Sequence, residues 1–483
     1  MRSIKKFRVK FETLFDLLVL SAGELTNILL GIAAFSHLAR TLGPKAYGAV
    51  EFAIAIGFVF AVGVDLGTSA IGTREIVRNR ALIPKLAAEI PATRLVLALI
   101  AIPLMGGSSL FMGQPEETVR LVWFFSFALL ALPWQHRWLL QGLELTNWVS
   151  PARAIRMMIF ALGSIALVHS PSDLTRVGMI EIIAAAGLAG YFLFVQQRRI
   201  TPLRISFSRP AMRHLIREGF PLGLTQVVWS ATQYLPILLV AVFIGGEAIA
   251  WFGAAHRIVM SLWTLSWLYH FNLYPILIRN LAASPEAFQS LVRPSLKVTG
   301  WVSVGIAMLI SILGTSLCQL IFGASFAVAG GTLSVLIWIL PATLLSGHAR
   351  SALIAEGFQK NVLHAQMVGG AVMLGLGALL VPSNGALGAA VAMVVSSFSV
   401  WAVAHVHAIQ KIAPMPGFGA IVRPAVAAVI AVAVARAALS EAWLTAGFSA
   451  IIFFILSLIF DRGLIADLRW ITRMKTHVAE DRT

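Results

Sequence analysis

The sequence predicts an all-α polytopic membrane protein. The chain has 483 residues, of which 58% are hydrophobic and 12% charged, and its mean hydropathy is +0.85, far above that of soluble domains. Apolar runs of about 20 residues, enough for an α-helix to cross the hydrocarbon core, recur along the whole chain. Helices are the expected spanning element because each satisfies its own backbone hydrogen bonds in lipid.

The apolar runs divide into fourteen predicted membrane spans. They are 14–38, 47–68, 92–112, 119–141, 149–168, 174–195, 215–244, 249–275, 296–322, 332–355, 362–381, 387–409, 421–438 and 443–460.

The basic residues that give the net charge of +16 lie in the connections between the spans and not on one surface. This distribution indicates that they set the orientation of the protein in the membrane and do not bind nucleic acid. The N-terminus, the second connection (69–91), the sixth, the eighth and the C-terminal tail are basic, whereas the connections GQPEET, GASFAVAG and VPSNG contain no basic residue. This alternation predicts an even number of spans with both termini in the cytoplasm. In the sixth connection, Ser208 followed by Pro210 predicts the start of a short basic helix on the inner membrane surface.

Two similar turn motifs suggest an internal repeat. LGPKAYGAV at 42–50 and IGGEAIAWFGAA at 244–255 share the order branched residue, glycine, charge, alanine, aromatic-Gly-Ala. Six predicted helices separate the two copies, which favours two six-helix lobes in pseudo-twofold repeat with two helices appended, a recurrent plan in transporters. The predicted boundaries are 1–205 for the first lobe, 206–412 for the second, and 413–483 for the last two helices and the basic tail.

Polar residues near the predicted membrane midplane are candidates for a binding cavity, because ionisable groups in lipid are costly. Each belongs to a polar or small stripe at helical spacing. The alternative for the small residues is close helix packing. The candidate substrate-binding residues are Arg257, Glu24, Asn27, Gln233, His256 and Ser261.

Charged residues nearer the ends of the spans suggest gating or surface roles. Glu51, Asp65 and Arg40 are candidates for a gate or for ion coupling, although a carboxylate at the interface without a special role is an equal alternative. Arg153, Arg156 and Arg350 are candidates for the cytoplasmic mouth, with snorkelling to the interface as the alternative.

No cofactor or metal site is predicted. The histidines share no metal-ligand spacing, and the single cysteine, Cys318, excludes an internal disulfide. The connections are too short to hold a folded catalytic domain. The expected function is therefore transport within the bilayer and not catalysis.

Four motifs carry a resemblance to a known family. They are ARTLGPKAYGAV at 39–50, DLGTSAIGTREIVR at 65–78, EGFPL at 218–222 and IGGEAIAWFGAAHRI at 244–258. In their order and spacing, the sequence resembles the polysaccharide and O-antigen flippases of the multidrug/oligosaccharidyl-lipid/polysaccharide exporter superfamily. The resemblance implies two six-helix lobes around a central cavity lined by the first, second, seventh and eighth spans. Relatives often carry a carboxylate in the seventh span, and Gln233-Tyr234-Leu235-Pro236 contains none. The resemblance therefore does not imply cation coupling through this span.

The resemblance also implies a function. The expected cargo is an oligosaccharide linked to polyprenyl diphosphate, flipped from the cytoplasmic to the outer leaflet of the bacterial inner membrane, with Arg257 contacting the diphosphate. Coupling to H⁺ or Na⁺, or the membrane potential alone, would supply the energy. The expected partners are the lipid-linked oligosaccharide, membrane lipids, a polysaccharide polymerase and glycosyltransferases. The alternatives are a cation-coupled drug or metabolite antiporter of the same superfamily and, less favoured, a membrane polysaccharide polymerase or glycosyltransferase.

Overall fold

The computed structural model of the protein describes residues 2–416 and 418–467, with the side chains of 2–22, 24, 146, 150, 225, 231 and 265 left undescribed. The chain divides into two compact units, Met1–Ala250 and Trp251–Thr483. The predicted three-part division at 205 and 412 remains a prediction.

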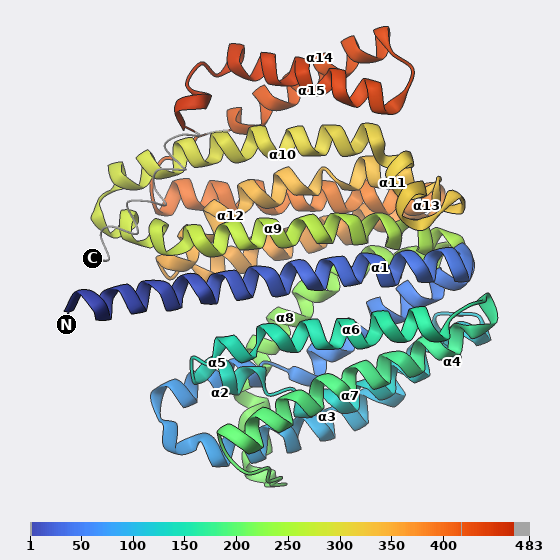
Figure 1. The fold of residues 1–483 in the computed structure, drawn as a ribbon, viewed down its shortest axis with the longest axis vertical. Helices are drawn as coiled ribbons and strands as arrows, with labels where there is room; N and C mark the ends of the chain where they lie inside the picture. The colour runs from blue at the N-terminus through green and yellow to red at the C-terminus, as the bar shows by residue number, and fades with distance from the viewer. Residues whose placement is uncertain (1, 417, 468–483) are drawn as a thin grey trace. The chain divides into compact units, whose positions relative to one another are not determined.

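The N-terminal unit is built from helices (Figure 1). They are α1 (Arg2–Asp65), α2 (Thr68–Arg78), η1 (Arg80–Leu82), α3 (Ile83–Phe111), α4 (Glu116–Phe127), η2 (Ala128–Trp134), α5 (Arg137–Gly142), η3 (Thr146–Trp148), α6 (Ser150–Leu167), η4 (Pro171–Asp173), α7 (Leu174–Arg199) and α8 (Arg209–Phe243).

The described part of the second unit is also helical, and its first helix begins just before the boundary. The helices are α9 (Glu247–Ala283), α10 (Pro285–Phe322), η5 (Ala324–Phe326), α11 (Ala329–Leu336), α12 (Ile339–Ala355), α13 (Gln359–Lys411), α14 (Gly419–Ala438) and α15 (Ala442–Phe460).

The all-helical, multi-span fold class is confirmed. Among the described residues, nine helical stretches are long and apolar enough to cross a membrane, and α8 makes a tenth if its two bent arms form one span. In two of these stretches, a single helix contains a glycine with non-helical backbone dihedral angles. α1 breaks at Gly43, where φ is 72°, and α13 breaks at Gly385, where φ is 53°.

The break in α1 lies at the predicted Leu42-Gly43-Pro44 turn. Gly43 occupies the left-handed region that glycine adopts without penalty. Shortly afterwards, α1 packs closely against the chain that follows α8: a Cβ at Gly48 would lie 2.8 Å from the carbonyl oxygen of Gly246 and 3.3 Å from the amide nitrogen of Ala250. The two turn motifs that suggested a repeat are therefore in contact.

The sequence suggested a loop for the second predicted connection (69–91), but the structure is helical there. Its first part is α2, whose buried residues Thr68, Ile71, Gly72 and Ile76 lie on one face of the helix while Arg74 is exposed. This amphipathic pattern is that of a helix lying on a core. The core beneath α2 is formed with α3, α5 and α8 by Ile71, Ile76, Leu86, Ile90, Trp138, Leu139 and Leu215.

The predicted span 119–141 is also interrupted, because the 3₁₀ segment η2, which contains Pro133, separates α4 from α5. Proline removes a backbone donor and breaks regular helix geometry.

The helix start predicted at Ser208 is confirmed, but the helix is not short. The Ser208 Oγ accepts a hydrogen bond from the amide of Ala211 at 3.4 Å, and Pro210 lies in the first turn. The helix then continues into the membrane span as α8 and ends at Phe243. Its arms Arg209–Ser230 and Thr232–Phe243 meet at an angle of 52°, near Pro236.

In the second unit, α10 lies between the α14–α15 pair and α12 (Figure 1). Polar contacts tie the end of α15 to α10. Asp461, the residue after α15, accepts a hydrogen bond from Trp301 Nε1 at 2.9 Å and lies 3.4 Å from both Lys297 Nζ and Arg423 Nη1. Apolar residues, among them Val304, Ala431 and Phe453, fill the space between α10, α14 and α15.

Candidate functional site

An ion pair between a buried arginine and a half-buried aspartate joins the end of α1 to α3 in the N-terminal unit. The guanidinium of Arg94, a residue only 3% exposed, pairs with the carboxylate of Asp65, the last residue of α1. Arg94 also donates hydrogen bonds to Thr68 Oγ1 at 2.8 Å and to Ser69 Oγ at 2.7 Å. The Ser69 hydroxyl donates to the Asp65 carboxylate at 2.7 Å. We call these four residues the Asp65 cluster.

The Asp65 cluster neutralises the positive charge of Arg94, which would otherwise destabilise the protein. Arg94 lies three turns inside α3, where an unpaired charge costs several kcal/mol. The ion pair with Asp65 and the hydrogen bonds to Thr68 and Ser69 give the buried guanidinium its partners.

The turn that places the Asp65 cluster lies against α8. Leu66 and Gly67 both have positive φ, 42° and 77°. A Cβ at Gly67 would lie 2.6 Å from the carbonyl oxygen of Gly219, and a Cβ at Gly223 would lie 2.8 Å from the Cα of Leu66. Only glycines permit this contact of backbone with backbone.

This contact gives a physical reason for two of the motifs that carried the resemblance. The motif at 65–78 supplies the turn and α2, and the motif at 218–222 supplies the facing part of α8. A further contact joins them at the surface, where Arg74 Nη2 lies 2.8 Å from Glu218 Oε2. Because both side chains are exposed, this ion pair contributes little stability.

The predicted cavity residues of the N-terminal unit lie on α1 and α8. Asn27 and Gln233 are both half-buried. Next to Gln233, the ring of Tyr234 lies 4.7 Å from that of Phe58, so α1 and α8 pack through aromatic side chains at this level. The side chain of Glu24 lies outside the described residues.

The gate candidates lie at three different places along α1. Arg40 is exposed just before the Gly43 break, and Glu51 is buried on the arm after it, at 3% exposed. Asp65, at the end of the helix, belongs to the Asp65 cluster. Its carboxylate is therefore already paired with Arg94.

The predicted cavity residues of the second unit lie on α9. Arg257 and Ser261 are one turn apart on the same face and half-buried, and the Ser261 hydroxyl donates to the Arg257 carbonyl oxygen at 3.0 Å. His256 is buried and stacks on Phe252, with ring centroids 5.7 Å apart. The imidazole thus packs within the protein, unlike the half-buried Arg257 beside it.

The three mouth candidates differ in their surroundings. Arg156 of α6 forms an ion pair with Glu181 of α7. Arg153 is exposed, and Arg350 is half-buried on α12.

A second polar cluster joins α9, α10 and α12. The hydroxyls of Tyr269 and Ser295 are 2.5 Å apart, and Ser295 Oγ is 2.7 Å from His348 Nε2. The ring of His270 lies 5.1 Å from that of His348. Each such hydrogen bond contributes about 1 kcal/mol to stability, so this cluster fixes the three helices against one another.

Sequence reasoning overlooked Arg94 and Glu181. Glu181 lies well inside the predicted span 174–195, so the rule that selected Glu24 and Arg257 would have found it. Arg94 lies near the start of the predicted span 92–112 and belongs with the charged residues near the span ends. Their partners could not be found in this way, because Asp65 and Arg156 are distant in sequence. Within the described residues, no group of three or more His, Cys, Asp or Glu side chains is arranged to hold a metal ion.

A sequence profile decides the family. The profile of the family described as “Polysaccharide biosynthesis protein” matches residues 14–281, more than half of the chain. The chain belongs to the polysaccharide biosynthesis protein family. A member of similar sequence is the “Putative O-antigen transporter” of Escherichia coli (strain K12), which is 22% identical over 307 residues, covering 62% of this chain and 73% of that protein.

Solved structures share the fold of this polysaccharide biosynthesis protein. The lipid II flippase MurJ in an inward closed conformation superposes with a TM-score of 0.71 at 14% identity, covering 93% of this chain and all of that one. An inward-facing multidrug resistance MATE family transporter of the MOP superfamily superposes with a TM-score of 0.63 at 18% identity, covering 82% and 98% of the two chains. The resemblance inferred from the motifs is thereby confirmed. The chain thus shares the multi-span helical fold of these solved structures.

Proposed function

We propose that this protein is a flippase that moves a polyprenyl-diphosphate-linked oligosaccharide, the repeat unit of a polysaccharide, from the cytoplasmic to the outer leaflet. The observation that carries the proposal is the family match across residues 14–281. The name of the Escherichia coli relative supports an O-antigen-type cargo. The fold shared with the lipid II flippase is suited to moving a lipid-linked sugar by alternating access.

The proposal includes fourteen spans in the bacterial inner membrane with both termini in the cytoplasm. The two arms of α1 and the two arms of α13 count as two spans each, and α4 with α5, and α11 with α12, as one broken span each. Together with α3, α6, α7, α8, α9, α10, α14 and α15, these make fourteen. The proposed lobes remain 1–205 and 206–412, followed by 413–483.

The physical need for such a protein is the barrier to a sugar in lipid. Each unsatisfied hydroxyl in hydrocarbon costs several kcal/mol, which a polar path through the protein removes. An inside-negative potential also favours outward movement of a diphosphate by roughly 2.3 kcal/mol per charge per 100 mV. The potential alone, or coupling to H⁺ or Na⁺, can drive the transport cycle.

In this proposal Arg257 contacts the diphosphate, because a guanidinium binds phosphate oxygens in a bidentate manner. Glu24, Asn27, Gln233, His256 and Ser261 remain the proposed contacts for sugar, with Arg153, Arg156 and Arg350 at the cytoplasmic mouth. A cation-coupled drug antiporter would need carboxylates available to cations. The Asp65 carboxylate is already paired with Arg94, which favours the flippase.

A genetic test uses Arg257→Gln in a bacterial strain that depends on this protein for surface polysaccharide. We expect at least a tenfold loss of polysaccharide and an accumulation of lipid-linked oligosaccharide. A tenfold change corresponds to roughly 1.4 kcal/mol, which is less than the contribution of one charge-assisted hydrogen bond between Arg257 and the diphosphate. Arg279→Gln, an exposed arginine on the same helix, is the control and should retain normal polymer. Normal polymer in Arg257→Gln, at wild-type protein level in the membrane, would show that Arg257 is not the diphosphate contact.

A further inference from the structure

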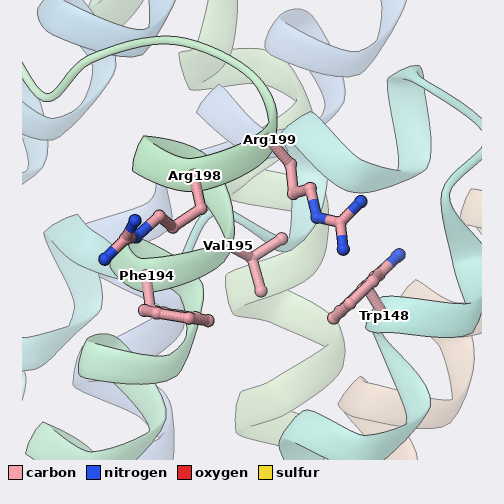
Figure 2. Close-up of a pocket in the computed structure, with 5 residues that line it drawn as sticks. All are labelled: Trp148, Phe194, Val195, Arg198 and Arg199. Atoms are coloured by element: carbon pink, nitrogen blue, oxygen red, sulfur yellow. The ribbon is translucent and has the colours of Figure 1, made fainter.

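A pocket with two arginines opens at the end of α7 in the N-terminal unit. It has a volume of about 330 Å³ and is lined by Trp148, Phe194, Val195, Arg198 and Arg199. Figure 2 shows the two guanidinium groups on either side of Val195, each near its own aromatic ring. We call this the Arg198–Arg199 pocket.

Each arginine is held over an aromatic ring. The Cζ atom of Arg199 lies 5.4 Å from the centroid of the Trp148 ring, and that of Arg198 lies 5.9 Å from the Phe194 ring. Trp148 is itself fixed, since the hydroxyl of Tyr191 donates to its carbonyl oxygen at 3.0 Å. Stacking on a ring restricts the guanidinium and leaves its N–H donors free to bind a second group.

Within the part of the chain that the structure describes, these two arginines have no carboxylate partner, whereas several other arginines of this unit do. Among the described residues, neither Arg198 nor Arg199 forms an ion pair, although both are exposed. By contrast, an acidic side chain pairs with Arg74, Arg94, Arg120, Arg156 and Arg176. The pocket therefore presents two positive charges that nothing in the described part of the chain neutralises.

The position of the pocket suggests an amphiphilic ligand. The predicted topology places the end of α7 at the cytoplasmic surface, where lipid headgroups are anionic and attract basic side chains. Phe194 lies one turn before Arg198, towards the predicted membrane interior, and is 60% exposed. A ligand with a phosphate at the level of the arginines and an apolar chain along the exposed ring of Phe194 would match both parts of the pocket.

The end of α7 opposes an anion only in part. Free carbonyl groups at a helix C-terminus carry a partial negative charge of about one half. The two full positive charges of Arg198 and Arg199 outweigh it, and the carbonyl oxygen of Gln196 is already paired with the amides of Ile200 at 2.9 Å and Thr201 at 3.0 Å.

We propose that the Arg198–Arg199 pocket binds the phosphate headgroup of an anionic membrane lipid. Two lipids carry this chemistry at the cytoplasmic surface: an anionic phospholipid of the leaflet, and a polyprenyl phosphate or diphosphate carrier. The site lies away from Arg257 in the sequence and does not depend on the proposed transport cycle.

The test is lipid binding to the purified full-length protein by native mass spectrometry. The probes are phosphatidylglycerol, cardiolipin and a polyprenyl phosphate, with zwitterionic phosphatidylcholine for comparison. For the Arg198→Gln/Arg199→Gln variant we expect at least a tenfold loss of affinity for an anionic lipid, roughly the effect of one lost charge-assisted contact. The matched control, Arg204→Gln/Arg209→Gln, removes the same charge from the connection after α7 and from the first residue of α8, outside the pocket. It should change the affinity less than about threefold.

The outcomes are distinct. A loss confined to the polyprenyl phosphate identifies the carrier as the ligand, and a loss confined to the phospholipids identifies the leaflet lipid. Equal losses in the pocket variant and the control, or equal binding of phosphatidylcholine, would overturn the proposal. Because the assay measures binding only, a protein that binds lipid here but moves no oligosaccharide would contradict the proposed function and not this site.

Discussion

Replacing Arg94 by methionine is expected to destabilise the protein by roughly 2–3 kcal/mol, because it leaves the Asp65 carboxylate, whose side chain is 24% exposed, without its positive partner. The side chain of methionine fills much of the same space, so the effect reports the lost charge and not a cavity. Hydrogen bonds to Thr68 and Ser69 are lost at the same time. The free energy of unfolding, measured in bicelles or by titration with a denaturing detergent, is the readout.

Two further variants isolate the ion pair as the cause. Arg120→Met breaks the exposed pair with Glu116, 2.9 Å apart on α4, and should cost no more than about 1 kcal/mol. The double variant Asp65→Leu/Arg94→Met removes both charges and should be more stable than Arg94→Met alone, because no unpaired charge remains. If Arg94→Met is as stable as the wild-type protein, the Asp65 cluster does not stabilise this region.

Gly67→Ala is expected to destabilise the protein by about 2–5 kcal/mol. Alanine pays roughly 1–2 kcal/mol for a left-handed backbone conformation, and the new methyl group would lie 2.6 Å from the carbonyl oxygen of Gly219 and 2.9 Å from the amide nitrogen of Gly223. Backbone atoms cannot rotate away as a side chain can, so α8 must move, at a further cost of about 1–3 kcal/mol. Thermal unfolding of the purified protein measures the change.

The control is Gly107→Ala on α3. A Cβ at Gly107 meets no atom within 4 Å, and alanine favours the helix by up to about 1 kcal/mol. This variant should therefore be as stable as the wild-type protein or slightly more so. Similar losses in Gly67→Ala and Gly107→Ala would mean that the contact between the Leu66–Gly67 turn and α8 does not set the stability.

The fold class could be predicted from sequence because the length of an apolar run is a local property of the chain. The turn at Gly43 could be predicted for the same reason, since glycine directly precedes proline there. α2 was missed because its 11 residues are too short and too polar for a span, and its apolar face becomes evident only against Trp138 and Ile90. The break at η2 was missed for a related reason, since the surrounding residues are as apolar as an unbroken span.

The candidate site was harder to predict, because it depends on pairs of residues distant in sequence. Asp65 was selected as a charged residue near the end of a span, but Arg94, 29 positions later, determines its environment. Likewise, the sequence alone gives no role for Gly219 of the EGFPL motif or for Gly223 just after it. Their role follows from the close approach of the Leu66–Gly67 turn.

The most direct test of the proposed function is transport in vesicles that contain only the purified protein and a labelled polyprenyl-diphosphate oligosaccharide. A sugar-modifying reagent that does not cross the membrane reports how much of the lipid has reached the outer leaflet. The proposal predicts that the modified fraction rises well beyond that in protein-free vesicles, and that Arg257→Gln slows this rise. A modified fraction that stays at the level of protein-free vesicles, from protein shown to be folded, would contradict the assignment as a flippase.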